Sequence, residues 1–395
     1  MSAWGEEVLV QDSLAMSSQL AVLARSLGIQ KPDSCGSTEL TWQEWITHQQ
    51  RRRTLLVAYC LFNLQSIIFN IPPQIPTREV ALCLPSCESE WKTSSQTAWK
   101  RHRATSAQYE RSFPETLSQL LCGQDVTQDG LLGPFSNYIL IHGLVQKIYF
   151  ERQAADYVPH QTFPMRPQSL ENIETALKCW QCSWEATWES TLDPYSPKGP
   201  LGFNATALLR LAYIRLNCHS GLCHDLLSGD PIRIKSLVSD SQLDCLNRSP
   251  SLDRAVLQCI HALSIPVRVG IPYLARTQTL HWSVQHSICH LECAFLLMRW
   301  MQTIAKAVEV GGMASLRGDE RKLVTMARYL IQETDLQYLM EGQAGDSLNM
   351  GFLTASTARL WADISSGIHV FNIVHRIGAS LSAIADALEH QLLVS

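Results

Sequence analysis

The sequence predicts an all-α fold, an irregular array of many helices. Apolar residues recur at helical spacing through most of the 395 residues, and breaks rich in proline or glycine separate these stretches. No stretch alternates strongly enough to predict a sheet, and there is neither a useful run of heptads nor a short internal repeat. The length allows one large domain or two intimately packed ones, and we expect a single domain over residues 1–395.

The N-terminal part predicts two helices in succession. Residues 14–27 place several leucines on one helix face, and the following residues to Ser37 break the helix. A longer helix is expected to start at Thr41, which can form a capping box with Glu44, and to end at Pro72-Pro73. Its apolar residues predict one broad buried face. They are Trp42, Trp45, Ile46, Leu56, Val57, Cys60, Leu61, Leu64, Ile67 and Ile68.

Arg51, Arg52 and Arg53 lie in the middle of this longer helix. Because successive helical residues are about 100° apart, the three side chains spread over roughly 200°, and at least one cannot point straight into water. We expect that one to pair with a carboxylate or to stack on a tryptophan. Arg53 is expected to be the most inward, because it precedes Leu56 and Val57 by three and four residues. A nucleic-acid patch is the alternative, but no further basic run extends the three charges.

Further helices are expected along the rest of the chain. The expected ranges are 112–121, 135–155, 170–192, 280–310, 317–340, 353–364 and 369–393. Trp180, Trp184 and Trp188 follow at four-residue steps within the third of these ranges. Such a stripe is typical of a helix core or of a groove for a partner helix, and less typical of a cofactor site.

Charge and hydropathy argue against nucleic-acid binding by the chain alone and against a membrane span. The formal net charge is −4, and the basic residues are scattered. The apolar stretch 55–71 falls short of the roughly 20 residues that a span needs. Four polar residues also interrupt it, namely Asn63, Gln65, Ser66 and Asn70. The acidic N-terminus differs from a secretory signal, so cytosol or nucleus is expected.

Thirteen cysteines raise the question of a metal or disulfide site. Their odd number in a long chain does not resemble a secreted disulfide framework. Cys179 and Cys182 have CxxC spacing, but no second pair follows at zinc-finger distance. A denser cluster comprises Cys218, His219, Cys223 and His224.

One further row of potential ligands lies on a single expected helix face. Its members are His286, Cys289, His290 and Cys293. Four ligands in line along about 10 Å of helix cannot surround one zinc ion without a second segment, so we interpret the row as a packing stripe. No metal site is expected. Since the sequence also lacks a phosphate-binding loop and a GxSxG motif, we expect no catalytic or cofactor-binding residues, and no enzyme.

The order of motifs in residues 39–101 is more informative. A tryptophan-led helix start is followed by the three arginines, an apolar stretch, a proline break, the segment Leu84-Pro85-Ser86-Cys87-Glu88-Ser89-Glu90-Trp91, and Trp99. This order resembles the signature segment of the fungal-specific transcription factor domain. Residues 203–216, 248–250, 261–268 and 282–287 are similar to the C-terminal part of a subgroup that carries two-cysteine two-histidine zinc fingers. The resemblance implies one regulatory domain, with the signature in residues 39–101 and a C-terminal helical part in residues 104–395.

The chain departs from the family pattern at two points. His48-Gln49-Gln50 stand where acidic residues usually precede the arginines, so an ion pair must use another carboxylate. Zinc-finger spacings are absent from the sequence, and we expect the chain to start partway into the helix array.

The resemblance implies transcriptional regulation in the nucleus through transcription regulators or co-regulators, without autonomous sequence-specific DNA binding. A small-metabolite-sensing helical module and a non-functional truncated regulator are the alternatives. Homodimer or heterodimer formation and a small-molecule effector stay open at this point, and so does the sign of regulation.

Overall fold

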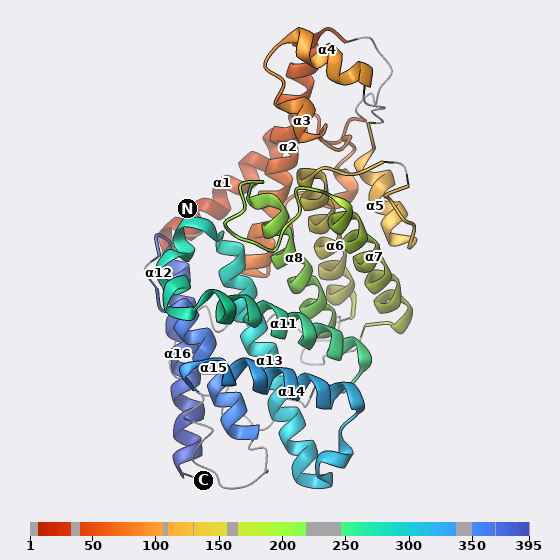
Figure 1. Cartoon of the computed structure of the whole chain (residues 1–395). Coiled ribbons are helices and arrows are strands. Elements are labelled where there is room, and N and C mark those ends of the chain that lie inside the picture. Colours follow the sequence, from red (N-terminus) through yellow and green to blue (C-terminus); the bar gives the residue numbers. More distant parts are fainter. Residues whose placement is uncertain are drawn as a thin grey trace. The chain divides into compact units, whose positions relative to one another are not determined.

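The computed structural model describes residues 7–32, 40–105, 110–128, 130–155, 165–218, 246–336, 350–367 and 369–394. These residues form 14 α-helices and no strand, with one isolated antiparallel bridge between Cys83 and Ser112 (Figure 1). The predicted all-α, irregular multi-helix array is confirmed. The chain divides into two compact units, the N-terminal unit (Gln11–Ala212) and the C-terminal unit (mainly Tyr213–Ser395). A single domain over residues 1–395 stays a prediction.

Helix α2 (Trp42–Phe69) starts and ends as its sequence predicts. The Thr41 hydroxyl accepts a hydrogen bond from the Glu44 backbone N–H at 3.3 Å, and the Thr41 backbone N–H donates to the Glu44 carboxylate at 2.8 Å. Asn70 ends the helix in the left-handed region, with φ of 50°. Local side-chain chemistry therefore sets both ends of the helix.

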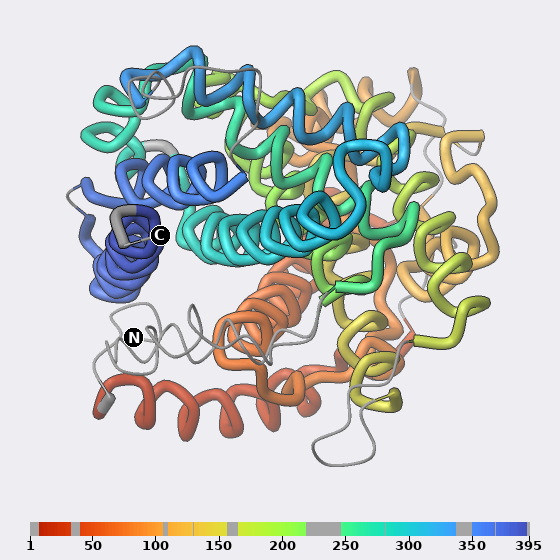
Figure 2. Tube along the Cα trace, turned by 90° about the horizontal axis from the view of Figure 1, so that it is seen from below, coloured from red at the N-terminus to blue at the C-terminus, as the bar shows by residue number. Residues whose placement is uncertain are grey.

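Helix α1 (Glu7–Ser26) runs antiparallel to α2. Gln65, near the end of α2, donates to the Ser13 hydroxyl, whereas Arg51, nearer its start, donates to the carbonyl of Leu27 just after α1. Figure 2 shows the two helices as neighbouring red and orange tubes.

The buried face of α2 differs from the predicted one. Trp45, Leu56 and Cys60 are buried as expected, but Val57 and Leu61 are 45% and 56% exposed. Polar side chains take part of the inward face, which apolar periodicity alone could not indicate. They are Gln49, Arg52, Asn63 and Ser66.

Six further helices follow in the described part of the chain up to residue 217. They are α3 (Glu88–Trp91), α4 (Gln96–Thr105), α5 (Phe113–Leu121), α6 (Pro134–Ala155), α7 (Pro167–Ala186) and α8 (Pro200–Asn217). No helix was predicted for α3, α4 or α8. Helix α6 packs against α2, α5 and α7 and is buried over most of its length.

Gln146 of α6 links three segments of the N-terminal unit. Its amide nitrogen donates to Asn63 of α2 at 2.7 Å and to the Ile75 carbonyl at 3.1 Å. Its amide oxygen accepts from the hydroxyl and the backbone N–H of Thr77. The proline break after α2 is thus held against α6 by hydrogen bonds.

The predicted tryptophan stripe is wrong at its C-terminal end. Helix α7 ends at Ala186, and Trp188 lies beyond it with 70% of its surface exposed. Trp180 is fully buried, and its indole N–H donates to the Asn137 carbonyl at 2.8 Å. The Trp184 indole donates to the Gly202 carbonyl.

The C-terminal unit contains six further helices among its described residues. They are α11 (Pro250–Val269), α12 (Ile271–His281), α13 (Val284–Gly311), α14 (Gly318–Gln332), α15 (Met350–Ser365) and α16 (Asn372–Val394). Helix α13 is buried along most of its length and packs against α11, α15 and α16. Gly378 allows α16 to approach α15 closely, because a Cβ there would lie 2.5 Å from the Ser365 carbonyl oxygen.

Two helix predictions in this unit need correction. The helix expected over 280–310 starts only at Val284, and Leu280 belongs to α12, where it is 76% exposed. The helix expected to reach residue 340 ends at Gln332. No helix was predicted for the range of α11 or for α12 before residue 280.

No single described helix has the length and apolar composition of a membrane span, although α11 and α12, bent by 99°, pass that test as a pair.

Trp45 anchors the start of α2 and provides a test of this core. It is 2% exposed, and its ring centroid lies 6.2 Å from that of Trp91 and 5.6 Å from that of Trp99. We expect Trp45→Ala to lower the free energy of unfolding by ~3–5 kcal/mol, because a large aromatic side chain leaves a cavity. The control Val57→Ala, at an exposed site of the same helix, should change it by no more than ~0.5 kcal/mol. Urea denaturation measures both, and equal midpoints would contradict the core assignment.

Candidate functional site

Arg51 joins α2 to the C-terminal end of α1. Its Nε donates to the Leu27 carbonyl at 2.9 Å, and its Nη2 donates to the Gly28 carbonyl at 3.0 Å. The last carbonyls of a helix have no partner within the helix and carry partial negative charge. The Leu27 and Gly28 carbonyls directly follow α1, and the Gly28 carbonyl also accepts from the Lys31 backbone N–H at 3.1 Å, so the guanidinium group completes the hydrogen bonding of this turn.

Arg52 joins α2 to the segment that precedes α5. Its side chain is 2% exposed, and its Nη2 lies 3.0 Å from a carboxylate oxygen of Glu110. Its Nη1 also donates to the Leu84 carbonyl at 3.4 Å. This neighbourhood is fixed by backbone hydrogen bonds between residues 82–84 and 111–113.

Arg53 joins α2 to the start of α3. Its Nη1 lies 3.1 Å from Glu88, and its Nη2 donates to the Ser86 carbonyl at 2.9 Å. The guanidinium carbon is 4.5 Å from the ring centroid of Trp91, which is within cation–π range. Arg53 thus uses both kinds of partner that the sequence predicted, a carboxylate and a tryptophan.

The order of burial among the three arginines corrects the prediction. Arg52, not Arg53, is the most buried, because the inward face of α2 runs through Gln49 and Arg52, and Val57 lies on the exposed side. The ion pairs described above for these arginines involve no acidic residue of α2. The carboxylates come from Glu88 and Glu110, which lie 35 and 58 residues from their partners in sequence.

A second charged cluster lies next to Trp45. Glu90 is 1% exposed, and it accepts a hydrogen bond from the Trp99 indole at 3.2 Å. Arg103 pairs with the same carboxylate at 3.3 Å and lies 5.0 Å from the Trp99 ring centroid. The buried carboxylate therefore has both a hydrogen-bond donor and a counter-ion.

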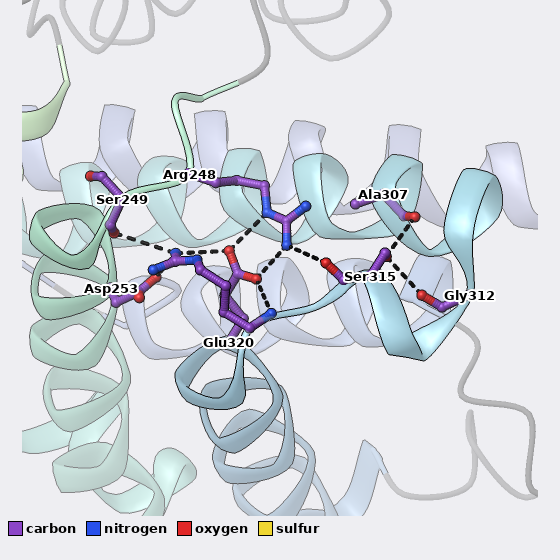
Figure 3. Close-up of polar contacts among 8 residues, drawn as sticks. Arg248, Ser249, Asp253, Ala307, Gly312, Ser315 and Glu320 are labelled. Carbon is purple, nitrogen blue, oxygen red and sulfur yellow. Dashed lines mark hydrogen bonds and ion pairs between the residues drawn. The ribbon is translucent and has the colours of Figure 1, made fainter.

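The C-terminal unit contains an ion cluster that was not predicted from the sequence (Figure 3). Glu320 in the first turn of α14 accepts from Arg248 Nε at 2.8 Å, and from both the backbone N–H and Nη2 of Arg317, each at 2.8 Å. Arg317 also donates to Asp253 of α11 at 2.7 Å. Arg248 further donates to the Ser315 carbonyl at 2.9 Å.

This cluster, formed by Arg248, Asp253, Arg317 and Glu320, ties the start of α11 to the start of α14. Glu320 is fully buried. Burial alone would raise the pKa of its carboxyl, but hydrogen bonds from Arg248 and Arg317 outweigh that effect and lower the pKa to about 2. The carboxylate lacks spare acceptor sites for a substrate, so the cluster suits a structural role.

A local signal existed for one part of this cluster. Glu320 lies three residues after Arg317, the position from which a glutamate closes a capping box. Ser249-Pro250 is an equally recognisable helix start. The pairing between the two helix starts joins residues 72 apart, and no local pattern indicates it.

The predicted row His286, Cys289, His290 and Cys293 is buried on α13. The His290 ring centroid lies 5.0 Å from that of Trp282 and 4.9 Å from that of Trp361. The two cysteine sulfurs are 3.8 Å apart. Aromatic rings and sulfur are thus among their neighbours, and the interpretation as a packing stripe stays a prediction.

Another ion pair lies beside this row. Arg215 of α8 donates to both carboxylate oxygens of Glu292, at 3.2 and 3.1 Å from Nε, and both side chains are under 10% exposed.

The other cysteine predictions have different outcomes. Cys179 and Cys182 are free thiols on α7, the first half-buried and the second exposed. Of the cluster at 218–224, only Cys218 lies within the described residues. Cys83 is disulfide-bonded, while nine other described cysteines are free. Over the residues that the structure describes, no group of three His, Cys, Asp or Glu side chains is arranged to hold a metal ion.

Two family profiles match the chain. The fungal specific transcription factor domain matches residues 12–181. The fungal transcription factor C-terminal domain matches residues 219–383. The chain belongs to the fungal-specific transcription factor family. No curated protein and no solved structure matches it.

Both charged sites described above lie within the matched domains of the fungal-specific transcription factor family. The arginine run and its partners lie in the first matched domain, and the cluster around Glu320 lies in the second. These domains are regulatory and support a role in transcriptional regulation. In this family member, the described polar sites hold helix ends in position.

The arginine run gives a graded prediction. Arg52→Ala should lower the free energy of unfolding most, by ~3–5 kcal/mol, because it leaves Glu110 without its buried partner. Arg53→Ala should cost about 1–3 kcal/mol, since its environment is more exposed. Arg51→Ala should cost least, about 1 kcal/mol, because its carbonyl partners can turn to water. Urea denaturation of the three variants gives the order, and equal losses would contradict it.

Glu320→Gln tests the ion cluster through pH. We expect a loss of ~2–3 kcal/mol at pH 6, since the pKa of Glu320 is lowered on folding from its ordinary 4.5 to about 2. That contribution is complete above the unfolded pKa and disappears as pH falls through the folded one. The stability gap between wild type and variant should therefore shrink between pH 4.5 and pH 2.

The neighbouring Asp319→Asn is the matched control, because Asp319 is 71% exposed in its pair with Lys322. This variant should have nearly the same free energy of unfolding as wild type at every pH. A Glu320→Gln gap that stays constant down to pH 3 would show that the carboxylate charge is not what stabilises the unit.

Proposed function

We propose that this chain regulates transcription in the nucleus through protein partners, transcription regulators or co-regulators, rather than by reading DNA itself. The observation that carries the proposal is the engagement of the arginine run. Arg51, Arg52 and Arg53 form the densest basic stretch of the chain. Each of their guanidinium groups already binds carbonyls or carboxylates of the same protein.

DNA binding requires cations that can neutralise phosphates and side chains that reach base edges. A guanidinium group that holds a buried carboxylate would have to break that pair before it could contact a phosphate. The formal net charge of −4 adds long-range repulsion from DNA. The cost of breaking these ion pairs and the repulsion between like charges together disfavour promoter recognition by this chain alone.

Contact with other proteins is better supported by the surface. Large apolar side chains stay exposed in both units, among them Trp188 at 70%, Tyr273 at 55% and Leu280 at 76%. Tryptophan and tyrosine are enriched at protein interfaces relative to the rest of a protein surface. Within each unit, the buried ion pairs keep the supporting helices in fixed positions.

The test is a tethering experiment in fungal nuclei. The full chain is fused to an unrelated DNA-binding domain whose sites lie upstream of a reporter gene. We expect the fusion to raise or lower reporter transcription severalfold relative to the DNA-binding domain alone at equal expression. The untethered chain should leave the reporter unchanged, because it cannot select the promoter.

Two outcomes would contradict the proposal. A fusion that is folded and nuclear but leaves the reporter unchanged would mean that the chain recruits no regulator. An untethered chain that changes the reporter through a defined promoter sequence, and binds that sequence when purified, would mean that it reads DNA directly.

A further inference from the structure

Helix α1 reverses the usual arrangement of a surface helix. Its inward face consists of small residues: Ser13, Ser17, Ala21 and Ala24 are all under 10% exposed. Several large apolar residues point outward instead. Met16, Leu20 and Leu23 of α1, and Leu27 directly after it, are 47%, 50%, 56% and 56% exposed. A surface helix normally buries its large apolar side chains and exposes its small and polar ones.

The four exposed residues form one stripe. Residues 16, 20, 23 and 27 follow at steps of four, three and four. The Leu27 backbone N–H still donates to the Leu23 carbonyl, so the four residues lie on one face over about 16 Å. At about 100° per residue, this face lies roughly 90° from the small-residue face. The stripe therefore lies along one flank of α1, beside its contact with α2.

Two exposed residues of α2 extend the stripe. The contacts of Ser13 with Gln65 and of Leu27 with Arg51 fix the antiparallel register of the two helices. In that register Val57 and Leu61 lie level with residues 17–21, and the helical rotation turns them to the same flank as the stripe. We call Met16, Leu20, Leu23, Leu27, Val57 and Leu61 the α1–α2 patch.

We propose that the α1–α2 patch is the contact surface for a second copy of this chain, with the two α1 helices antiparallel across a two-fold axis. In that arrangement the stripe of one copy packs against the same stripe of the other copy. The steps of four, three and four read the same in both directions, so Met16 meets Leu27 of the second copy and Leu20 meets its Leu23. Such a self-complementary contact closes as a dimer.

The charges at the two ends of the stripe favour a second copy over another partner. Asp12 lies four residues before Met16 on α1. Lys31 follows the Gly28 turn that ends the helix, with its side chain beside Gly28, and both charged residues are exposed. The two-fold axis that pairs the leucines also brings Asp12 of one copy to Lys31 of the other, twice in each dimer. Attraction at both ends then fixes the antiparallel orientation.

The surroundings of the patch fit an interface. Exposed, uncharged polar residues border it, including Gln19 on α1 and Gln50 and Thr54 on α2. An apolar centre with a polar rim is the usual composition of a protein contact. Because the patch spans two helices rather than a large surface, we expect a dimer with Kd on the order of micromolar.

The first test is sedimentation equilibrium of the full chain at concentrations up to ~100 µM, well above the expected Kd. Wild type should show a monomer–dimer equilibrium, and Leu20→Glu should raise the Kd at least ~10-fold, because each copy then places a charge against an apolar side chain. Val22→Glu is the matched control. Val22 is 63% exposed on the other side of α1, and its variant should dimerise like wild type.

The second test is a charge exchange that only self-pairing predicts. Asp12→Lys and Lys31→Asp should each weaken the dimer, since each creates two like-charge contacts. A mixture of the two variants should form heterodimers, and the double variant Asp12→Lys/Lys31→Asp should recover dimerisation. A monomeric wild type at the highest concentration, equal effects of the Glu variants at 20 and 22, or no recovery on charge exchange would each overturn the proposal.

Discussion

The N-terminal unit depends on three adjacent guanidinium groups of α2. They point in three directions, so one stretch of helix reaches the end of α1, the segment before α5 and the start of α3. Each of these segments is held in part by hydrogen bonds to α2. Buried cations are costly without partners, so the partners must be in place for α2 to pack. Helix packing and ion pairing in this unit are therefore coupled.

The C-terminal unit uses the opposite charge arrangement. There, one buried carboxylate, Glu320, collects donors from two arginines, and the cluster joins the first turns of α11 and α14. Carboxylates also interact favourably with the partial positive charge at helix N-termini. In both units, the buried charges fix where helix ends lie. Buried polar contacts thus hold the helices of both units in position, as expected of a scaffold whose surface binds other proteins. The family assignment indicates that this scaffold is regulatory.

The parts of the fold that the sequence predicted correctly depend on local chemistry. The capping box at Thr41 and the buried Trp45 follow from residues within a few positions of each other. The wrong predictions involve partners that are remote in sequence. Arg52 is buried because Glu110 meets it across 58 residues, and no periodicity within α2 could reveal that. Likewise, the pairing of Arg248 with Glu320 was not predictable, although the helix start at Ser249-Pro250 was recognisable.

The consecutive placement of the arginines also limits how this stretch of the gene can change in length. One residue inserted or deleted between Trp45 and Arg51 would turn all three arginines by about 100° relative to that tryptophan. Each guanidinium group would then face a neighbour's partner or the solvent, and three contacts would be lost together. Substitutions can remove these contacts one at a time, whereas an insertion or deletion removes all of them in one step. The segment from Trp45 to Arg53 should therefore tolerate codon replacement far better than a change in codon number.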